Sequence, residues 1–423
     1  MEHIVITGQK KLSGEVFISG AKNASVAIIP AAICADGVCI VDNLPHIEDV
    51  SSFIDAITKI GVQCELLDKN TIKIDASTLS SYHANFDSVR KMRASYYLIG
   101  ALLGRFKKAE VALPGGCNFG SRPIDQHIKG FEALGATVKI EHGLVKASAE
   151  KLTGAHIYLD MASVGATINI MFAAVYAEGV TTIENAAKEP HIVDTANFLN
   201  TLGAKIKGAG TDVIKITGVK KLHGGEYTII PDQIEAGTYM VAAAITGGDV
   251  TIRNIIPKHM DSVSAKLREI NCVINEGDDY IQVIGSGDIQ SSNVKTMYYP
   301  GFPTDLQPQV TALLTLAKGT SIVTETVFEN RFQYINELKR LGAEVTVDGR
   351  IAVIEGVEKL TGAEVTATDL RAGASLVVAA LAAEGKTTIS NVKYIDRGYE
   401  DIENKLRALG AQIERVTVTG NPD

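Results

Sequence analysis

The sequence contains no tryptophan, and aromatic residues make up only 6% of its 423 residues. Proteins that bind single-stranded nucleic acids stack bases on aromatic side chains, so this scarcity argues against such a function. Basic residues are also in the minority, because 41 Lys and Arg stand against 49 Asp and Glu, giving a net charge of -8. That balance excludes a generally basic nucleic-acid-binding protein, although it leaves room for a locally basic cleft.

Long apolar runs are missing as well. No uncharged stretch of about 18 apolar residues occurs, so we expect no membrane span. The first eight residues, MEHIVITG, do not place an apolar segment after a basic one, so we expect no signal peptide. The five cysteines are odd in number and lack CxxC spacing, which is typical of free thiols in a reducing compartment. These absences predict a cytoplasmic protein.

Cofactor and metal motifs are absent too. The sequence has neither a G-x-x-x-x-G-K-[ST] loop nor a G-x-G-x-x-G segment after a strand pattern. Its nine histidines show no HExxH motif or paired metal-ligand spacing. We therefore expect an activity that uses no cofactor and no metal.

What the sequence does contain is an internal repeat. Leu-Gly-Ala followed by a strand pattern begins at Leu134, Leu202, Leu341 and Leu409, with degenerate copies at Ile60 and Ile270, roughly 70 residues apart. Ala-rich stretches recur in phase with it and end at Gly37, Gly104, Gly179, Gly247, Gly319 and Gly385. Because these stretches are apolar on nearly all sides, they predict buried helices.

Six units of this size predict an α/β protein built from repeated modules. A module of about 70 residues can hardly bury its own helix, so the modules must pack together, three to a lobe. We expect one lobe over residues 22–231 and a second over residues 1–21 plus 232–423, with the active site in the cleft between them. On this count the first strands complete the last unit.

Polar residues stand at the starts of the predicted buried helices. They are Lys22 with Asn23, Arg93, Ser163, Asp232, Asp305, and Asp369 with Arg371. Helix N-termini favour anions, so together with Arg122, Arg331 and Arg397 in nearby loops this set predicts a cationic cleft for anionic substrates. The alternative interpretation is that each Asp or Ser only caps its helix and each Arg is a surface residue.

One loop carries a distinctive thiol. The segment LPGGCNFGSRPID spans residues 113–125 and places Cys117 five residues before Arg122. Its glycines and prolines predict a movable lid, and the nearby guanidinium predicts an exposed thiol of lowered pKa. Cys34, Cys39, Cys64 and Cys272 lie in apolar stretches and are expected in the core.

Several motifs together resemble those of the UDP-N-acetylglucosamine 1-carboxyvinyltransferases, a family of enolpyruvyl transferases, over the whole chain. They are SGAKNA from Ser19, MRAS from Met92, PGGC from Pro114 with RPID from Arg122, FPTD from Phe302, TVFENRF from Thr326, TDLRA from Thr368 and IDRGYE from Ile395. The resemblance implies an inside-out α/β barrel fold in two lobes of three units each.

The resemblance also implies a reaction, in which enolpyruvate passes from phosphoenolpyruvate to the 3'-hydroxyl of UDP-N-acetylglucosamine with release of phosphate. The family begins peptidoglycan precursor synthesis in this way, which links it to cell wall formation, cell shape and cell division. The acceptor adds to C2 of phosphoenolpyruvate to give a tetrahedral ketal, which then eliminates phosphate. Cys117 would be the general acid, the residue that forms the pyruvate adduct and the target of fosfomycin.

Roles for the remaining residues follow from the same resemblance. Asp305 would take the proton of the sugar hydroxyl, with Asp369 assisting near the reacting centre. Lys22, Arg122 and Arg397 would hold the phosphate and carboxylate of phosphoenolpyruvate, supported by Arg331 and Arg371. Contacts to the UDP-sugar are expected from Asn23, Arg93, Arg122, Pro123, Ile124, Asp125, Gln126, Asp160, Met161, Ala162, Ser163, Asp305 and Val327, along with the cationic residues.

Two positions depart from the family pattern. Met161 stands where the family often has a Lys near the nucleotide, and Tyr394 stands where relatives often have a His. Both are features expected of a second copy of the enzyme, of the sort some Gram-positive bacteria carry. We expect a monomer or weak oligomer.

Two other functions remain open at this point. A shikimate 3-phosphate enolpyruvyl transferase would share the fold and the donor, but the Pro-Gly-Gly-Cys loop is a feature of the UDP-sugar enzymes. A non-catalytic, UDP-sugar-binding regulatory paralogue would be expected to lack Cys117 or Asp305, and both are present.

Overall fold

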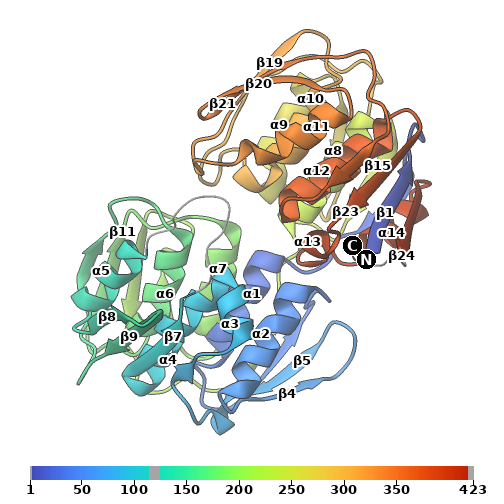
Figure 1. Ribbon diagram of the computed structural model, residues 1–423. Coiled ribbons are helices and arrows are strands. Elements are labelled where there is room, and N and C mark those ends of the chain that lie inside the picture. Colours follow the sequence, from blue (N-terminus) through green and yellow to red (C-terminus); the bar gives the residue numbers. More distant parts are fainter. Residues whose placement is uncertain (1, 114–123, 418–423) are drawn as a thin grey trace. The chain divides into compact units, whose positions relative to one another are not determined.

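The computed structural model describes residues 2–113 and 124–417. The described chain divides into two compact units (Figure 1). The first unit runs from Gly20 to Ile230, and the second contains the N-terminal residues up to Ser19 together with Pro231 and the residues that follow it. The chain therefore passes between the units twice, after Ser19 and after Ile230.

The described residues form six four-stranded sheets, three in each unit. Every sheet has the same plan: an edge strand pairs in parallel with a central strand, and two antiparallel strands follow. In the first unit the sheets are β14 (Gly225–Thr228), β3 (Val38–Asp42), β5 (Ile72–Asp75) and β4 (Gln63–Leu66); β6 (His83–Ala84), β7 (Lys108–Ala112), β9 (Leu144–Ser148) and β8 (Thr137–Glu141); and β10 (His156–Tyr158), β11 (Val180–Glu184), β13 (Val213–Thr217) and β12 (Lys205–Lys207).

The three sheets of the second unit repeat this plan. They are β2 (Ser13–Phe17), β15 (Asp249–Arg253), β17 (Tyr280–Ile284) and β16 (Val273–Glu276); β18 (Val294–Lys295), β19 (Thr320–Thr324), β21 (Ile351–Glu355) and β20 (Glu344–Asp348); and β22 (Glu364–Thr366), β23 (Lys386–Ser390), β1 (Glu2–Thr7) and β24 (Gln412–Thr417). The predicted six-fold repeat and α/β fold class are thus confirmed.

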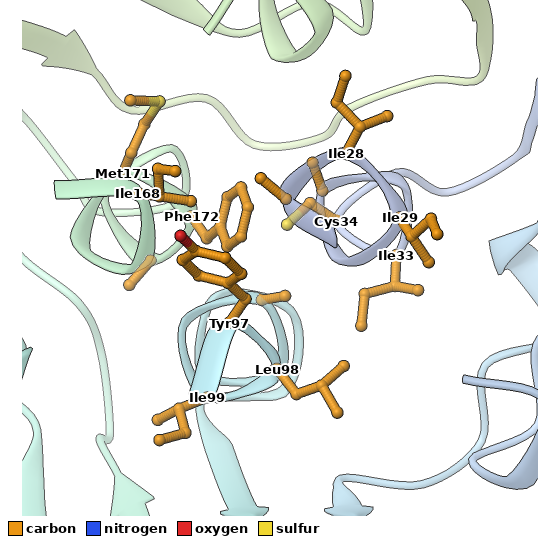
Figure 2. Close-up of a cluster of buried hydrophobic side chains, with 14 of the residues drawn as sticks. Ile28, Ile29, Ile33, Cys34, Tyr97, Leu98, Ile99, Ile168, Met171 and Phe172 are labelled. Atoms are coloured by element: carbon orange, nitrogen blue, oxygen red, sulfur yellow. The ribbon is translucent and has the colours of Figure 1, made fainter. Parts of the chain in front are cut away.

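Each repeat contributes one buried helix. These are α1 (Lys22–Ala32), α4 (Tyr97–Phe106) and α6 (Val164–Ala174) in the first unit, and α8 (Gln233–Ile245), α10 (Gln307–Leu314) and α12 (Leu370–Ala382) in the second. Buried side chains project from several sides of α1, α4 and α6, and the rings of Tyr97 and Phe172 lie in the space between the helices (Figure 2). There the rings of Tyr97 and Phe172 meet edge to face with centroids 6.2 Å apart. Helices that are apolar all round are thereby buried all round.

A second helix in each repeat is followed by a residue in the left-handed conformation. These helices are α2 (Glu48–Lys59), α5 (Asp125–Ala133), α7 (Pro190–Thr201), α9 (Asp261–Glu269), α11 (Ile335–Arg340) and α14 (Ile402–Ala408). The residues with positive φ, between 78° and 102°, are Gly61, Gly135, Gly203, Asn271, Gly342 and Gly410. They are the middle residues of the Leu-Gly-Ala repeat, which explains why glycine dominates there. Two short helices, α3 (Asp87–Lys91) and α13 (Lys393–Asp396), complete the α-helical elements of the described chain.

Three details differ from the sequence-based expectation. The second Ala-rich helix does not end at Gly104; α4 continues to Phe106, and Lys107 takes the left-handed conformation instead. Gly104 serves helix packing, because a Cβ there would lie 2.8 Å from the backbone oxygen of Phe172. Cys64 is half-buried rather than in the core, since β4 is an edge strand.

The third difference concerns the N-terminal strands. Only β1 completes the last repeat, where it pairs with β23 and β24. The next strand, β2, pairs in parallel with β15 and so belongs to the fourth repeat. In the same way, β14 precedes the fourth buried helix but pairs with β3 of the first repeat. In both cases, the last strand before the chain passes to the other unit completes a sheet of the unit that the chain leaves.

Candidate functional site

The first predicted site residue, Lys22, is the first residue of α1 and is held by an ion pair. Its Nζ lies 3.0 Å from Oδ2 of Asp49, in the first turn of α2, and both side chains are largely buried. An ammonium group has three donor hydrogens, so Lys22 can keep Asp49 and still bind an anion at the start of α1. Asn23 follows it and is half-buried.

Gln126 joins two of the segments expected to hold a UDP-sugar. Its amide nitrogen donates to Asp125 at 2.9 Å and to Asp160 at 3.0 Å, and its oxygen accepts the backbone N–H of Asp160 at 2.9 Å. Lys129, on the same helix α5, donates to Asp160 at 2.7 Å. The hydrogen bonds from Lys129 and then Gln126 hold the pKa of Asp160 below its ordinary value. Buried Gln126 therefore fixes an otherwise exposed turn onto α5.

The turn that begins at Asp160 leads into α6. Ser163 caps this helix by accepting the backbone N–H of Ala166 at 3.2 Å. Met161 is exposed and Ala162 is half-buried. Ile124 is buried just before the start of α5. The structure thus brings the predicted residues from Ile124 to Gln126 and from Asp160 to Ser163 into one region of the first unit.

A buried imidazole that the sequence analysis did not single out lies beneath this region. Nδ1 of His127 is 2.9 Å from the amide nitrogen of Asn169, whose oxygen accepts the backbone N–H of Gly100 at 2.8 Å. Burial lowers the pKa of His127 to about 4, against the attraction of Asp125. The ring is therefore neutral near pH 7 and accepts the hydrogen bond through Nδ1, which connects α4, α5 and α6. Its position in the sequence directly after Gln126, a predicted site residue, was the signal that could have identified it.

In the second unit, Asp305 binds two buried guanidinium groups. Its Oδ1 is 3.3 Å from Nη2 of Arg331, and its Oδ2 is 3.1 Å from Nη2 of Arg371. Both arginines are only 4% exposed, so the expectation that they are surface residues is wrong for this pair. Burial tends to lower the pKa of Arg371, but Asp305 acting together with Tyr399 and Asp232 more than offsets it and holds that pKa above its ordinary value. Three predicted site residues are thereby joined.

The capping interpretation holds for Asp232 and Asp369, but Asp305 lies within the 3-10 segment Thr304–Leu306 and is not an N-cap residue. Asp369 accepts the backbone N–H groups of Arg371 at 2.8 Å and Ala372 at 3.1 Å. Asp232 caps α8 in the same manner, through the N–H groups of Ile234 and Glu235. Capping fixes each carboxylate beside its helix start, and in the case of Asp369 also beside the backbone of Arg371.

Arg397 and Val327 lie in other parts of the second unit. Arg397 follows α13 directly and is half-buried. Its neighbour Asp396 makes a two-pronged contact with Arg415, at 3.0 and 2.6 Å, which ties the end of α13 to β24. Val327 follows β19 and donates its backbone N–H to Glu325 at 2.8 Å. Tyr394 is partly buried against the core of this unit.

Four predicted site residues are described only in part or not at all. Cys117, Arg122 and Pro123 lie outside the described residues, and for Arg93 the structure describes the backbone alone, in a 3-10 segment (Arg93–Tyr96) before α4. Over the described ranges, no cluster of three or more His, Cys, Asp or Glu side chains could hold a metal ion. In the same part of the chain, no helix is both long and apolar enough to cross a membrane.

Sequence comparison extends the resemblance over the whole chain. Residues 6–406 match the family described as EPSP synthase (3-phosphoshikimate 1-carboxyvinyltransferase). The chain is 58% identical to UDP-N-acetylglucosamine 1-carboxyvinyltransferase 2 of Clostridium acetobutylicum, over 98% of this chain and 99% of that protein. The chain is 59% identical to UDP-N-acetylglucosamine 1-carboxyvinyltransferase 3 of Caldanaerobacter subterraneus, over 98% of this chain and 100% of that protein. It is 54% identical to UDP-N-acetylglucosamine 1-carboxyvinyltransferase 2 of Bacillus subtilis, over 99% of this chain and 98% of that protein.

Solved structures share the fold. The enolpyruvyl transferase NikO from Streptomyces tendae superimposes with a TM-score of 0.89 at 27% identity, covering 99% of each chain. An EPSP synthase from Acinetobacter baumannii gives a TM-score of 0.76 at 22% identity, covering 98% of this chain and 100% of that one, a likeness of fold alone. The full-length identities and the shared fold show that this chain belongs to the UDP-N-acetylglucosamine 1-carboxyvinyltransferase family of enolpyruvyl transferases.

Proposed function

We propose that this protein transfers enolpyruvate from phosphoenolpyruvate to the 3'-hydroxyl of UDP-N-acetylglucosamine and releases phosphate, as the first committed step of peptidoglycan precursor synthesis. The observation that carries the proposal is the 54–59% identity, over nearly the whole chain, to relatives whose names state this activity. The match to the EPSP synthase description does not favour shikimate 3-phosphate, because identity is only 22% with an EPSP synthase of known structure but 58% and 59% with the UDP-N-acetylglucosamine enzymes.

In the addition step, the 3'-oxygen of the sugar bonds to C2 of phosphoenolpyruvate. Cys117 gives a proton to C3, and Asp305 receives the proton of the hydroxyl group. In the elimination step, C3 loses a proton, the C2–C3 double bond re-forms and phosphate leaves. General acid–base groups of this kind each typically contribute a rate factor of about 10² to 10⁴.

The cationic residues would bind the donor. Lys22, Arg122 and Arg397 take its phosphate and carboxylate groups, and buried Arg331 and Arg371 stabilise charge beside Asp305. Rigid guanidinium groups suit both anions, since each offers two parallel N–H donors. Asp369 is fixed at the start of α12 and acts near the same centre by electrostatics or proton transfer.

The UDP-sugar would lie against the region of the first unit that Gln126 organises. The side chain or backbone of Asn23, Arg93, the residues from Arg122 to Gln126, those from Asp160 to Ser163, and Val327 supply its contacts. Fixed turns at Asp160 and Ser163 reduce the ordering that substrate binding would require. The exposed side chain of Met161 offers no charge to the diphosphate.

This function places the protein in the cytoplasm, with roles in cell wall formation, cell shape and cell division, and makes Cys117 the residue that forms the pyruvate adduct and reacts with fosfomycin. The test is the structure of the product formed from phosphoenolpyruvate and UDP-N-acetylglucosamine, determined by NMR. An enolpyruvyl ether at the 3'-oxygen is expected. Recovery of unchanged UDP-sugar, with measurable binding of that sugar, would instead support a non-catalytic regulatory paralogue.

A further inference from the structure

Glu325 is a buried carboxylate that the proposed mechanism does not use. It directly follows β19 and is 0% exposed. Its Oε1 accepts the backbone N–H groups of Val327 at 2.8 Å and Phe328 at 3.1 Å, and the hydroxyl of Thr296 at 2.9 Å. Its Oε2 accepts the hydroxyl of Thr304 at 2.9 Å. Four donors therefore converge on one buried side chain.

The carboxylate is itself held in place from both sides. The backbone N–H of Glu325 donates to the oxygen of Arg350 at 2.8 Å. Thr296, which donates to Glu325, accepts the backbone N–H of Thr326 at 2.9 Å, and its own N–H donates to the oxygen of Thr324. Glu325 is thus a fixed point on the sheet of β18, β19, β21 and β20.

The two oxygens of Glu325 lead to two different parts of the proposed site. Through Oε2 the side chain holds Thr304, the first residue of the 3-10 segment (Thr304–Leu306) that carries Asp305. Through Oε1 it holds the turn that presents Val327. One rigid carboxylate therefore sets the distance between the acid–base group and a contact of the UDP-sugar.

We propose that Glu325 is a positioning residue for the reaction: it aligns Asp305 with the UDP-sugar held at Val327. This inference rests on the proposed function. A displacement of about 1 Å in a reacting group can cost a factor of about 10² in rate, so such a link matters for turnover rather than for the fold alone.

Three substitutions distinguish the role of the hydrogen bonds that Glu325 accepts from the role of its negative charge. In Glu325→Gln the amide oxygen can keep the three donors of Oε1, while the amide nitrogen donates to the Thr304 hydroxyl, which can also accept. Glu325→Ala leaves the buried N–H groups of Val327 and Phe328 without an acceptor. Thr304→Val removes only the bond to Oε2 and preserves the volume of the side chain.

The experiment measures kcat and KM for UDP-N-acetylglucosamine in these three variants of the full chain. Thr304→Val should lower kcat by about 10- to 100-fold with KM within about 2-fold, because the turn at Val327 keeps its bonds. Glu325→Ala should lower kcat similarly and raise KM by about 10-fold, whereas Glu325→Gln should stay within about 3-fold of the parent on both constants. The control is Thr315→Val, which removes a buried hydroxyl that donates to the backbone oxygen of Ala312 at the end of α10 and should leave both constants unchanged.

Hydrogen exchange supplies a readout that does not depend on turnover. In Thr304→Val, peptides containing residues 302–306 should exchange faster while those containing 326–330 keep their protection, and in Glu325→Ala both should exchange faster. Parental kcat in Thr304→Val, or a Glu325→Gln variant as impaired as Glu325→Ala, would overturn the inference. If the parent protein makes no product, the proposed function fails, and unchanged exchange in both segments of Glu325→Ala would separately refute the link.

Discussion

Nη2 of Arg371 lies 3.1 Å from Oδ2 of Asp305, on a guanidinium group that is almost fully buried at the start of α12. Arg331 approaches the other oxygen of the same carboxylate at 3.3 Å. The residue expected to receive the sugar proton is therefore also the counter-ion of two buried cations, and its chemical and structural roles can be separated by substitution.

Asp305→Asn should reduce kcat by about 10³-fold, because the amide cannot accept the sugar proton. UDP-sugar binding, measured by calorimetry, should remain detectable. The free energy of unfolding should fall by about 3 kcal/mol, since two buried guanidinium groups lose their carboxylate partner. Asp348→Asn, on exposed strand β20, is the matched control and should change neither quantity. Near-parental turnover in Asp305→Asn would rule out an essential base.

Fosfomycin should label this protein at Cys117 alone, and Cys117→Ser should abolish the labelling. The other thiols are poor nucleophiles, since burial raises the pKa of Cys34 to about 12 and those of Cys39 and Cys272 to about 11, and burial also raises the pKa of half-buried Cys64. Peptide mass spectrometry locates the adduct. An adduct on Cys64 in the parent protein would contradict the assignment.

Met161→Lys should lower KM for UDP-N-acetylglucosamine by about 3-fold, because an exposed cation near the diphosphate contributes well under 1 kcal/mol. The gain should shrink at high salt, as expected for a solvent-exposed charge. Met161→Gln is the polar control and should leave KM unchanged. A Lys variant with parental KM at low salt would mean that this position does not face the nucleotide.

Acid should destabilise the first unit through His127. The pKa of its imidazole is lowered from about 6.5 to about 4 by burial, so the folded state resists the proton that the unfolded chain accepts. The contribution of the neutral His127 imidazole to the free energy of unfolding is therefore complete above about pH 6.5. It is lost as the pH falls toward 4, by up to about 3 kcal/mol.

His127→Asn keeps an acceptor for Asn169 but cannot titrate, so urea unfolding should show a smaller loss of stability between neutral and acid pH. His156→Asn removes an exposed imidazole that pairs with Glu184 on a neighbouring strand, and its pH dependence should match that of the parent. Equal acid sensitivity in His127→Asn and the parent would show that another group governs the effect.

The repeat architecture was predictable because its signals are local. The Leu-Gly-Ala pattern marks a helix end that needs a left-handed residue, and Gly203 and Gly410 adopt that conformation with φ of 102° and 95°. The buried helices were evident from composition alone. The end of α4 was predicted wrongly at Gly104, because a glycine that allows close helix packing looks the same in sequence as one that ends a helix.

The site was predictable only in part. Lys22, Asp305 and Asp369 stand at helix starts, where sequence analysis looks for polar groups. Sequence analysis did not identify His127 and Glu325, because a buried polar residue has no periodic signature. The role of such a residue depends on partners elsewhere in the chain, such as Asn169 and Thr304. The pairing of β2 with β15 is equally non-local, since their residues are more than 200 positions apart in sequence.

Phosphate release from phosphoenolpyruvate, measured in parallel with UDP-N-acetylglucosamine, with shikimate 3-phosphate and without an acceptor, tests the account most directly. Sustained release with the UDP-sugar alone is the predicted result. Release with shikimate 3-phosphate alone would contradict the proposed acceptor, and no release with either would contradict enzymatic activity altogether.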